Sequence, residues 1–133
     1  GARRLAGGAA DATSGFFFRP TVFADVPLDA PAMREEPFGP VALIRGWSRP
    51  DEAIAIANGL EYGLAAYVFG PDEISTDRFA AQIQAGVVGI NTTAVAVPEM
   101  PFGGIKASGF GREGGEGSIR DYLDTRFTHR AAS

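Results

Sequence analysis

Segments typical of strands and of helices alternate along the middle of the chain, and this alternation constrains the fold most. Residues 41–47, 64–69 and 87–91 are short apolar runs of strand length. Between them lie two stretches with apolar residues at helical spacing, 48–60 and 74–85. Uninterrupted apolar runs of this kind are typical of strands buried on both faces. The order predicts an α/β fold, a Rossmann-like parallel sheet segment with right-handed crossover helices.

The two predicted helices carry boundary signals. Ser48 can cap the N-terminus of the first helix, and Pro50 lies near its first helical position. Asp51 and Glu52 follow in the first turn, where the helix dipole favours negative charge. Gly86 can end the second helix. Gly59 or Gly63 can end the first helix.

Weaker signals flank this central part. A long loop rich in glycine and proline covers residues 92–117, and loops of that length are usually functional or disordered. We expect the whole chain, residues 1–133, to form a single domain. The remaining predicted elements are a strand at 3–6, an extended aromatic segment at 16–23, a short helix at 118–123 and a strand at 125–130.

Composition and charge exclude several classes of function. A formal net charge of −4 argues against binding nucleic acid or an anionic membrane, which needs a basic face. No apolar run approaches the roughly 20 residues that span a bilayer. The absence of cysteine removes disulfides, thiolate metal sites and thiol catalysis. The cytoplasm is the expected location, because no signal peptide is recognisable.

Three motifs that could carry chemistry are better explained as structure. Residues 109–114 match G-x-G-x-x-G, but they do not join a strand to a helix as a dinucleotide site requires. His129 is the only histidine, and both a catalytic relay and a metal site need partners for it. Glu35 and Glu36 are adjacent, so in an extended segment they point opposite ways and cannot act as a pair. The sequence therefore predicts neither a catalytic residue nor a metal site.

Two proline-phenylalanine-glycine turns stand far apart in the chain, and with their surroundings they resemble the C-terminal part of the aldehyde dehydrogenase family. The first is Glu35-Glu36-Pro37-Phe38-Gly39-Pro40, and the second opens the stretch from Pro101 to Glu113, P-F-G-G-I-K-A-S-G-F-G-R-E. Three more matches keep the family's order: Gly15 to Phe23, Ala57-Asn58 with Tyr62 to Ala66, and Gln84-Ala85-Gly86 with Gly89-Ile90-Asn91. Each match is weak by itself. Together and in order they are specific.

The resemblance implies roles for five residues. Glu36 would accept hydrogen bonds from the nicotinamide-ribose hydroxyls of NAD or NADP, and Phe38 would pack against the nicotinamide. Phe102 would line the aldehyde tunnel, with Ala96 and Val97 on the preceding loop forming part of the substrate pocket. A carboxylate suits a vicinal diol because it offers two acceptor oxygens. The implied substrate is a small-molecule aldehyde, which the complete enzyme would oxidise to a carboxylic acid.

The same resemblance implies that part of the active site is missing. The family's nucleophilic cysteine, general-base glutamate, oxyanion-hole asparagine and dinucleotide-binding domain all lie upstream of the matched region. The chain begins at Gly1 and matches about the last quarter of a family member. We therefore expect a fragment of a dehydrogenase, inactive by itself.

The semialdehyde-oxidising branch, which includes the succinate-semialdehyde dehydrogenases, is the nearest by resemblance. Arg112-Glu113-Gly114-Gly115 and the residues after it are similar to that branch. In that branch a serine on the loop before Pro-Phe-Gly-Gly helps to bind the distal carboxylate of the substrate. Residues 94–100 read A-V-A-V-P-E-M and supply no hydroxyl there. A small apolar loop also fits a roomy pocket for an aliphatic or aromatic aldehyde.

The end of the chain, residues 124–133, resembles the family's oligomerisation strand. Phe127 would be its buried member, with Arg126 and Thr128 on the opposite face. This implies a homo-oligomer, a dimer or a tetramer. A rival hypothesis is a non-catalytic interaction or structural fragment of the same fold, which self-associates or complements an N-terminal half.

Overall fold

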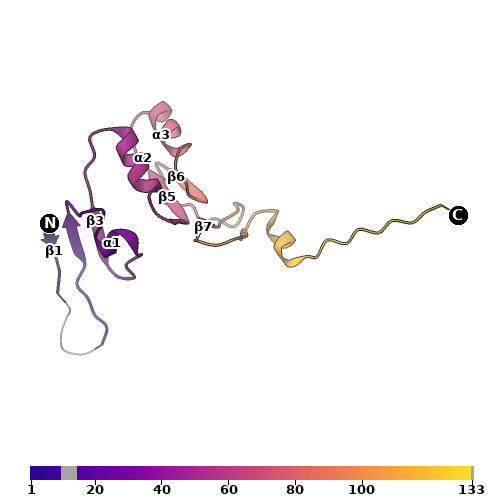
Figure 1. Cartoon of the computed structure of the whole chain (residues 1–133), viewed down its shortest axis with the longest axis horizontal. Coiled ribbons are helices and arrows are strands. Elements are labelled where there is room, and N and C mark those ends of the chain that lie inside the picture. The colour runs from indigo at the N-terminus through magenta and orange to yellow at the C-terminus, as the bar shows by residue number, and fades with distance from the viewer. Residues whose placement is uncertain (10–14, 133) are drawn as a thin grey trace. The chain divides into compact units, whose positions relative to one another are not determined.

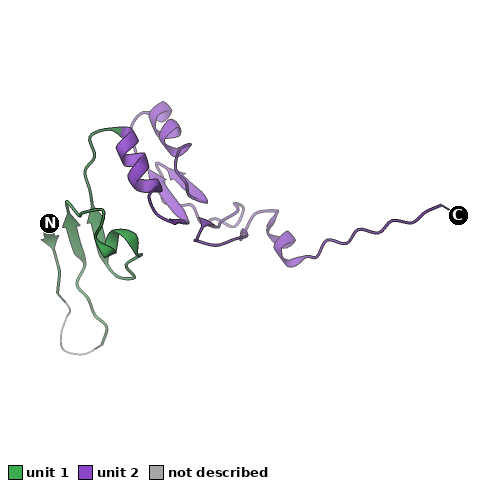
Figure 2. Ribbon diagram, in the orientation of Figure 1, with its two compact units in different colours: residues 1–49 green, residues 50–133 purple. Residues whose placement is uncertain are grey.

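The chain forms two compact units, residues 1–49 and residues 50–133 (Figure 2). This computed structural model describes residues 1–9 and 15–132. The assigned strands of each unit pair only within that unit. A single domain over residues 1–133 stays a prediction.

The first unit is built on a three-stranded sheet (Figure 1). Its elements are β1 (Arg3–Ala6), β2 (Thr21–Ala24), α1 (Pro31–Arg34) and β3 (Val41–Ile44). Strand β2 lies in the middle, antiparallel to β1 and parallel to β3. The strand predicted at residues 3–6 is confirmed. The aromatic segment 16–23 becomes a regular strand only from Thr21, because Pro20 has no N–H for a ladder bond.

Strand β3 is shorter and more exposed than the apolar run 41–47 predicts. It ends at Ile44, and half-buried and exposed residues alternate along it. Successive side chains of a strand point to opposite faces, so one face of β3, with Ala42 and Ile44, is open to solvent. The prediction that this strand is buried on both faces is wrong for the part of the chain that the structure describes.

The second unit contains the predicted crossover. Its elements are α2 (Pro50–Asn58), β4 (Tyr62–Gly63), β5 (Ala65–Val68), α3 (Glu73–Ala80), β6 (Val87–Ile90), β7 (Ile105–Lys106) and the 3₁₀ helix η1 (Ser118–Tyr122). Strands β5 and β6 pair in parallel around α3. Strands β4 and β7 form a separate antiparallel pair. Helix α2 begins at Pro50, with Asp51 and Glu52 in its first turn, as predicted.

One parallel sheet through all three predicted strands is not confirmed. Strand β3 pairs with β2 in the first unit, whereas β5 pairs only with β6 among the assigned strands. Consecutive strands are neighbours only about two-thirds of the time. The alternation of elements therefore identified the strands and the α/β class, but it did not identify their partners.

Helix α3 ends five residues before the prediction. It stops at Ala80, and the chain then turns, with Gln82 and Ile83 donating backbone bonds to Phe79 and Ala80. The side chain of Asn58 holds the next residues extended: it donates to the carbonyl of Gln82 and accepts from the N–H of Gln84, at 2.9 and 2.8 Å. A contact from α2 therefore ends a helix whose sequence pattern continues.

The end of the chain is extended but forms no assigned strand (Figure 1). This applies to residues 123–132, because residue 133 lies outside the described part. Phe127 is 86% exposed, and its ring stacks on that of His129 with centroids 6.4 Å apart. Residues two apart therefore share a face, as the predicted period of two requires. Burial of Phe127 and an oligomerisation strand at 124–133 stay predictions.

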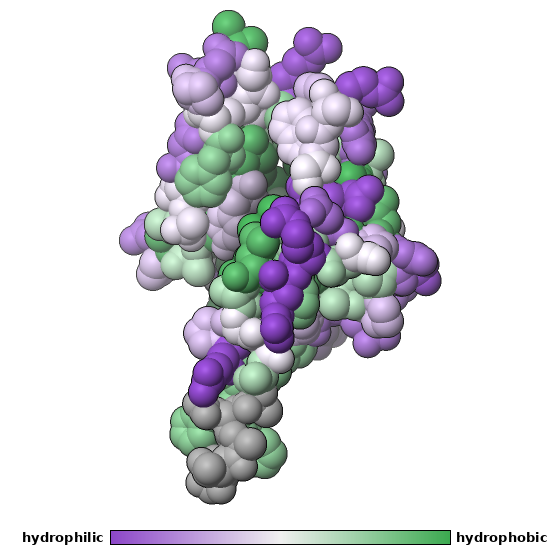
Figure 3. All heavy atoms as spheres, turned by 90° about the vertical axis from the view of Figure 1, so that its left-hand side faces the viewer, coloured by the Kyte–Doolittle hydropathy of each residue, from purple (hydrophilic) through white to green (hydrophobic). Residues whose placement is uncertain are grey.

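Few described side chains are fully buried. Apart from glycines, the buried residues in the described part are Thr21, Ala24, Val26 and Thr76. Large apolar side chains reach the surface, including those of Phe16, Phe38 and Phe110. Figure 3 shows apolar residues open to solvent among polar ones on the face that it draws. Among the described helices, none has the length and apolar character to cross a membrane.

Candidate functional site

The first Pro-Phe-Gly turn joins α1 to β3 in the first unit. Glu35 ends α1, its N–H donating to the carbonyl of Pro31 at 2.8 Å while its backbone becomes extended. At the far end of the turn, Thr21 N–H donates to the carbonyl of Pro40, also at 2.8 Å. Since Thr21 and Val41 are register partners of β2 and β3, this bond fixes the turn at the start of the sheet.

Both predicted cofactor-contact residues of this turn face solvent. Glu36 is exposed, and its carboxylate has no hydrogen-bond partner within the described residues. The ring of Phe38, two residues on, is 95% exposed. A carboxylate with two open acceptor oxygens suits a diol, and an uncovered aromatic face suits a planar ring. Roles for Glu36 at the ribose and for Phe38 at the nicotinamide of NAD or NADP stay predictions.

The Pro-Phe-Gly-Gly loop of the second unit is tied to a later part of the same loop. Phe102 and Glu113 exchange two backbone hydrogen bonds, each 2.7 Å long. The guanidinium of Arg112 donates to the carbonyls of Gly104 and Gly111 at 2.9 and 2.7 Å. These bonds fix the backbone on both sides of Phe102, whose side chain is half-buried.

Two glycines allow this loop to pack against β6. A Cβ on Gly86, just before β6, would overlap the carbonyl oxygen of Gly103. A Cβ on Gly104 would lie 2.5 Å from the Cβ of Ser108. Only glycine permits backbones to approach so closely.

The loop with Ala96 and Val97 leaves β6 through Asn91. Asn91 has a φ of 53°, and its side chain accepts from Gly70 N–H and donates to Gly70 carbonyl, both at 2.9 Å. Ala96 is exposed and Val97 is 37% exposed. Residues 96, 97 and 102 therefore belong to one unit, whereas Glu36 and Phe38 belong to the other.

The anchors of the Pro-Phe-Gly-Gly loop were missed in the sequence. Lys106, in β7, donates through its ammonium to the carbonyls of Asn58 and Leu60 at the end of α2. Ser108 accepts from the N–H of Gly63 in β4, at 2.9 Å. Composition gave the one signal that could have pointed to Lys106, because it is the only lysine in a chain with eleven arginines.

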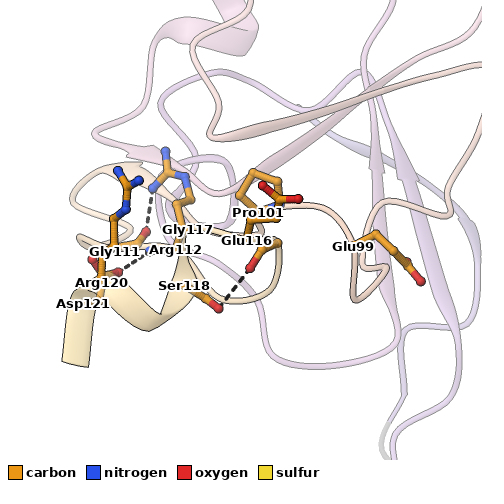
Figure 4. A pocket seen from close by; sticks show the side chains of 10 residues that line it. Glu99, Pro101, Gly111, Arg112, Glu116, Gly117, Ser118, Arg120 and Asp121 are labelled. Carbon is orange, nitrogen blue, oxygen red and sulfur yellow. Dashed lines mark hydrogen bonds between the residues drawn. The ribbon is translucent and has the colours of Figure 1, made fainter. Parts of the chain in front are cut away.

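The described pocket lies beside the predicted substrate residues and does not include them. It has a volume of about 510 Å³ (Figure 4). Its wall carries the carboxylates of Glu99, Glu116 and Asp121 and the guanidiniums of Arg112 and Arg120. Asp121 accepts from the backbone N–H of Arg112 at 2.9 Å, so part of this charge is already paired. Its lining residues are Glu99, Pro101, Gly111, Arg112, Gly115, Glu116, Gly117, Ser118, Arg120 and Asp121.

A thiol nucleophile and a clustered metal site are both absent from the residues that the structure describes. The chain has no cysteine. Within the described residues, no group of three His, Cys, Asp or Glu could hold a metal ion. His129 lies in the extended tail, where its ring contacts Phe127.

Comparison with known proteins identifies the family. The sequence model described as "Aldehyde dehydrogenase family" matches residues 1–128. The chain belongs to the aldehyde dehydrogenase family. The resemblance of the motifs to the semialdehyde branch is also confirmed, because succinate-semialdehyde dehydrogenases are among the relatives.

Three relatives illustrate the similarity. The 4-(hydroxymethyl)benzenesulfonate dehydrogenase TsaD1 of Comamonas testosteroni is 46% identical over 132 residues, 99% of this chain and 27% of the relative. The succinate-semialdehyde dehydrogenase GabD of Escherichia coli (strain K12), whose name gives NADP(+), is 44% identical over 127 residues, 96% of this chain and 26% of its own. The crystal structure of a mutant aldehyde dehydrogenase C from Pseudomonas syringae, in complex with NAD+ and octanal, has a TM-score of 0.87 and 42% identity, covering 95% of this chain and 26% of that one.

The chain thus spans about a quarter of the length of these aldehyde dehydrogenases. The structural neighbours are dehydrogenases of mixed α/β architecture, in agreement with the predicted class. Oxidation of aldehydes is the general activity of the family to which the chain belongs.

Proposed function

We propose that this chain is the C-terminal portion of an NAD(P)-dependent aldehyde dehydrogenase that oxidises an aldehyde to a carboxylic acid. The observation that carries the proposal is the ordered set of motifs inside the family match over residues 1–128. The chain contributes contacts and a pocket wall, since it has no cysteine. By itself it is inactive.

In this proposal Glu36 and Phe38 serve the cofactor. When bound there, the nicotinamide would supply the hydride acceptor for oxidation of the aldehyde carbon. Glu36 fixes the ribose through its two acceptor oxygens, and Phe38 limits the positions that the ring can take. The exposure of both side chains supports these roles, because neither is used in packing the first unit.

Phe102, with Ala96 and Val97, forms part of the substrate pocket. An apolar wall helps to exclude water around the reacting carbon. The names of the relatives support a semialdehyde or another aldehyde that carries an anionic group. The loop 94–100 offers no hydroxyl, so an anionic end of the substrate would be held by another part of the enzyme.

Replacing Glu36 in the full-length enzyme tests the proposal. Glu36→Gln keeps the shape but removes the charge, and we expect kcat/KM for the cofactor to fall about tenfold, as for a lost charge-assisted hydrogen bond. Glu35→Gln is the matched control, because this neighbouring carboxylate is equally exposed but points away in an extended segment. Equal steady-state and hydride-transfer rates in wild type and Glu36→Gln would contradict the assignment.

A non-catalytic role is the second candidate, favoured by the absence of cysteine. A fragment of this fold would then self-associate or complement an N-terminal half. Copurification of the chain with such a half, and aldehyde-dependent NADH or NADPH formation only by the pair, would support complementation. A homo-oligomer and a cytoplasmic location remain parts of the main proposal.

A further inference from the structure

Lys106 is set apart from every other cationic residue of the chain by its chemistry. Eleven positions carry arginine, and only residue 106 carries lysine. A lysine ammonium is a compact point charge, whereas the guanidinium of arginine is a broad planar fork. A chain that otherwise uses only arginine therefore has a local reason for a lysine at this position.

The contacts of Lys106 give that reason. Its ammonium donates to the carbonyls of Asn58 and Leu60, at 3.1 and 3.0 Å. Asn58 is the last residue of α2, where helix carbonyls lack partners within the helix and the dipole favours a positive charge, and Leu60 lies two residues beyond it. One small ammonium satisfies both oxygens. The broader planar guanidinium of arginine would displace them.

The backbone of Lys106 is also constrained. Its φ is 56°, a left-handed conformation that a residue with a long side chain adopts only when its surroundings impose it. On one side, Lys106 and Tyr62 are register partners of β7 and β4. On the other, the N–H of Ala107 donates to the carbonyl of Glu61 at 2.9 Å. The ammonium and the backbone therefore fasten β7 to the segment that follows α2.

Phe102 is joined to β7 by a short, closely packed segment. Only Gly103 and Gly104 separate Phe102 from β7. Gly104 is buried beside Ser108, and Gly103 is half-buried with its carbonyl close to the backbone of Gly86, so both glycines are closely packed between Phe102 and β7. A displacement at Lys106 is therefore passed on to Phe102.

We propose that Lys106 is a positioning residue for the substrate pocket, because its ammonium fixes β7 on the end of α2 and thereby sets the place of Phe102. This inference rests on the proposed function, in which Phe102 lines the aldehyde pocket. It adds a residue outside the pocket wall that determines how well the wall fits the aldehyde.

A double-mutant cycle between Lys106 and Phe102 in the full-length enzyme tests the inference. Lys106→Met keeps the length of the side chain and removes its charge and donors. We expect kcat/KM for the aldehyde to fall about tenfold, as misplacement of a positioning group typically does, with the KM for the cofactor within twofold of wild type. In the Phe102→Ala background, Lys106→Met should cause less than a further twofold loss, because its effect passes through Phe102.

Two control variants make each outcome decisive. Lys106→Arg keeps the positive charge and should recover less than half of the lost kcat/KM. The two carbonyls both lie about 3 Å from a single ammonium, and a planar guanidinium does not fit that arrangement. Arg78→Met, at an exposed cation in the last turn of α3, should match wild type. Losses that multiply in the double variant, or a loss shared equally by cofactor and aldehyde, would overturn the positioning role. A wild-type enzyme that oxidises no aldehyde would instead overturn the proposed function.

Discussion

At the scale of single residues, two side-chain amides connect segments of the second unit that are distant in sequence. Asn58 bridges the end of α2 to residues 82 and 84, and Asn91 clamps Gly70 at the ends of β5 and β6. An amide carries a donor and an acceptor, so it can satisfy an N–H and a carbonyl of a neighbouring segment at once. Both residues lie in stretches that resemble the family, but the sequence does not show which backbone groups they bind.

Asn91 combines this clamp with a left-handed backbone, and two substitutions separate the effects. Asn91→Gly tolerates the φ of 53° but loses both side-chain bonds to Gly70, whereas Asn91→Ala also strains the backbone. We expect amide-exchange protection at Gly70 to fall about tenfold in the glycine variant, as for one to two lost hydrogen bonds, and further in the alanine variant. Hydrogen-exchange mass spectrometry measures this. Equal protection in both variants would show that the backbone conformation is not strained.

At the scale of elements, the helices start closer to their predicted first residues than they end to their predicted last residues. Helix α2 begins at the proline that predicts it, and the crossover β5–α3–β6 is parallel as expected. Helix α3 ends early because the Asn58 side chain hydrogen-bonds the backbone of Gln82 and Gln84 after it. An N-terminal cap is a local signal, whereas here the C-terminus is decided by a contact from a distant segment.

The N-terminal cap of α3 makes this helix sensitive to acid. The Ser75 side chain and its backbone N–H hydrogen-bond the carboxylate of Asp72 and hold its pKa below the ordinary 3.8. Because the folded-state pKa is lowered, the cap contributes its full stability above the unfolded pKa and loses it as pH falls through the folded one. We expect exchange protection of the first turn of α3 to be constant above pH 5 and to drop below about pH 4. Asp72→Asn, which caps without titrating, should remove that dependence, and an unchanged acid profile would contradict it.

At the scale of the whole molecule, the chain exposes much apolar surface for its size. Few described side chains are fully buried, while many aromatic ones are open to solvent. Exposed apolar surface of this kind marks interaction sites. Under the proposed function, this surface would contact the rest of a dehydrogenase or further copies of the chain.

The extended tail gives a test of association. We expect Phe127→Glu in the full-length protein to weaken oligomerisation at least tenfold in dissociation constant, because it places a charge on the face predicted to be buried. Thr128→Glu, on the opposite face, is the control and should leave assembly unchanged. Sedimentation velocity over a range of concentrations measures both. Equal assembly of wild type and the Phe127 variant would remove this segment from the interface.

The sequence by itself determined the α/β class, the positions of most elements and the family, because apolar periodicity, helix-start signals and glycine-rich motifs are local properties. Lys106 shows the limit of sequence patterns. The sequence shows that it is the only lysine, but not that its ammonium binds two carbonyls more than forty residues away. The tertiary structure alone decided that β3 pairs with β2, that α3 stops at Ala80 and that Gly103 passes against Gly86. Each of these depends on which distant backbone groups meet, and a one-dimensional pattern does not contain that information.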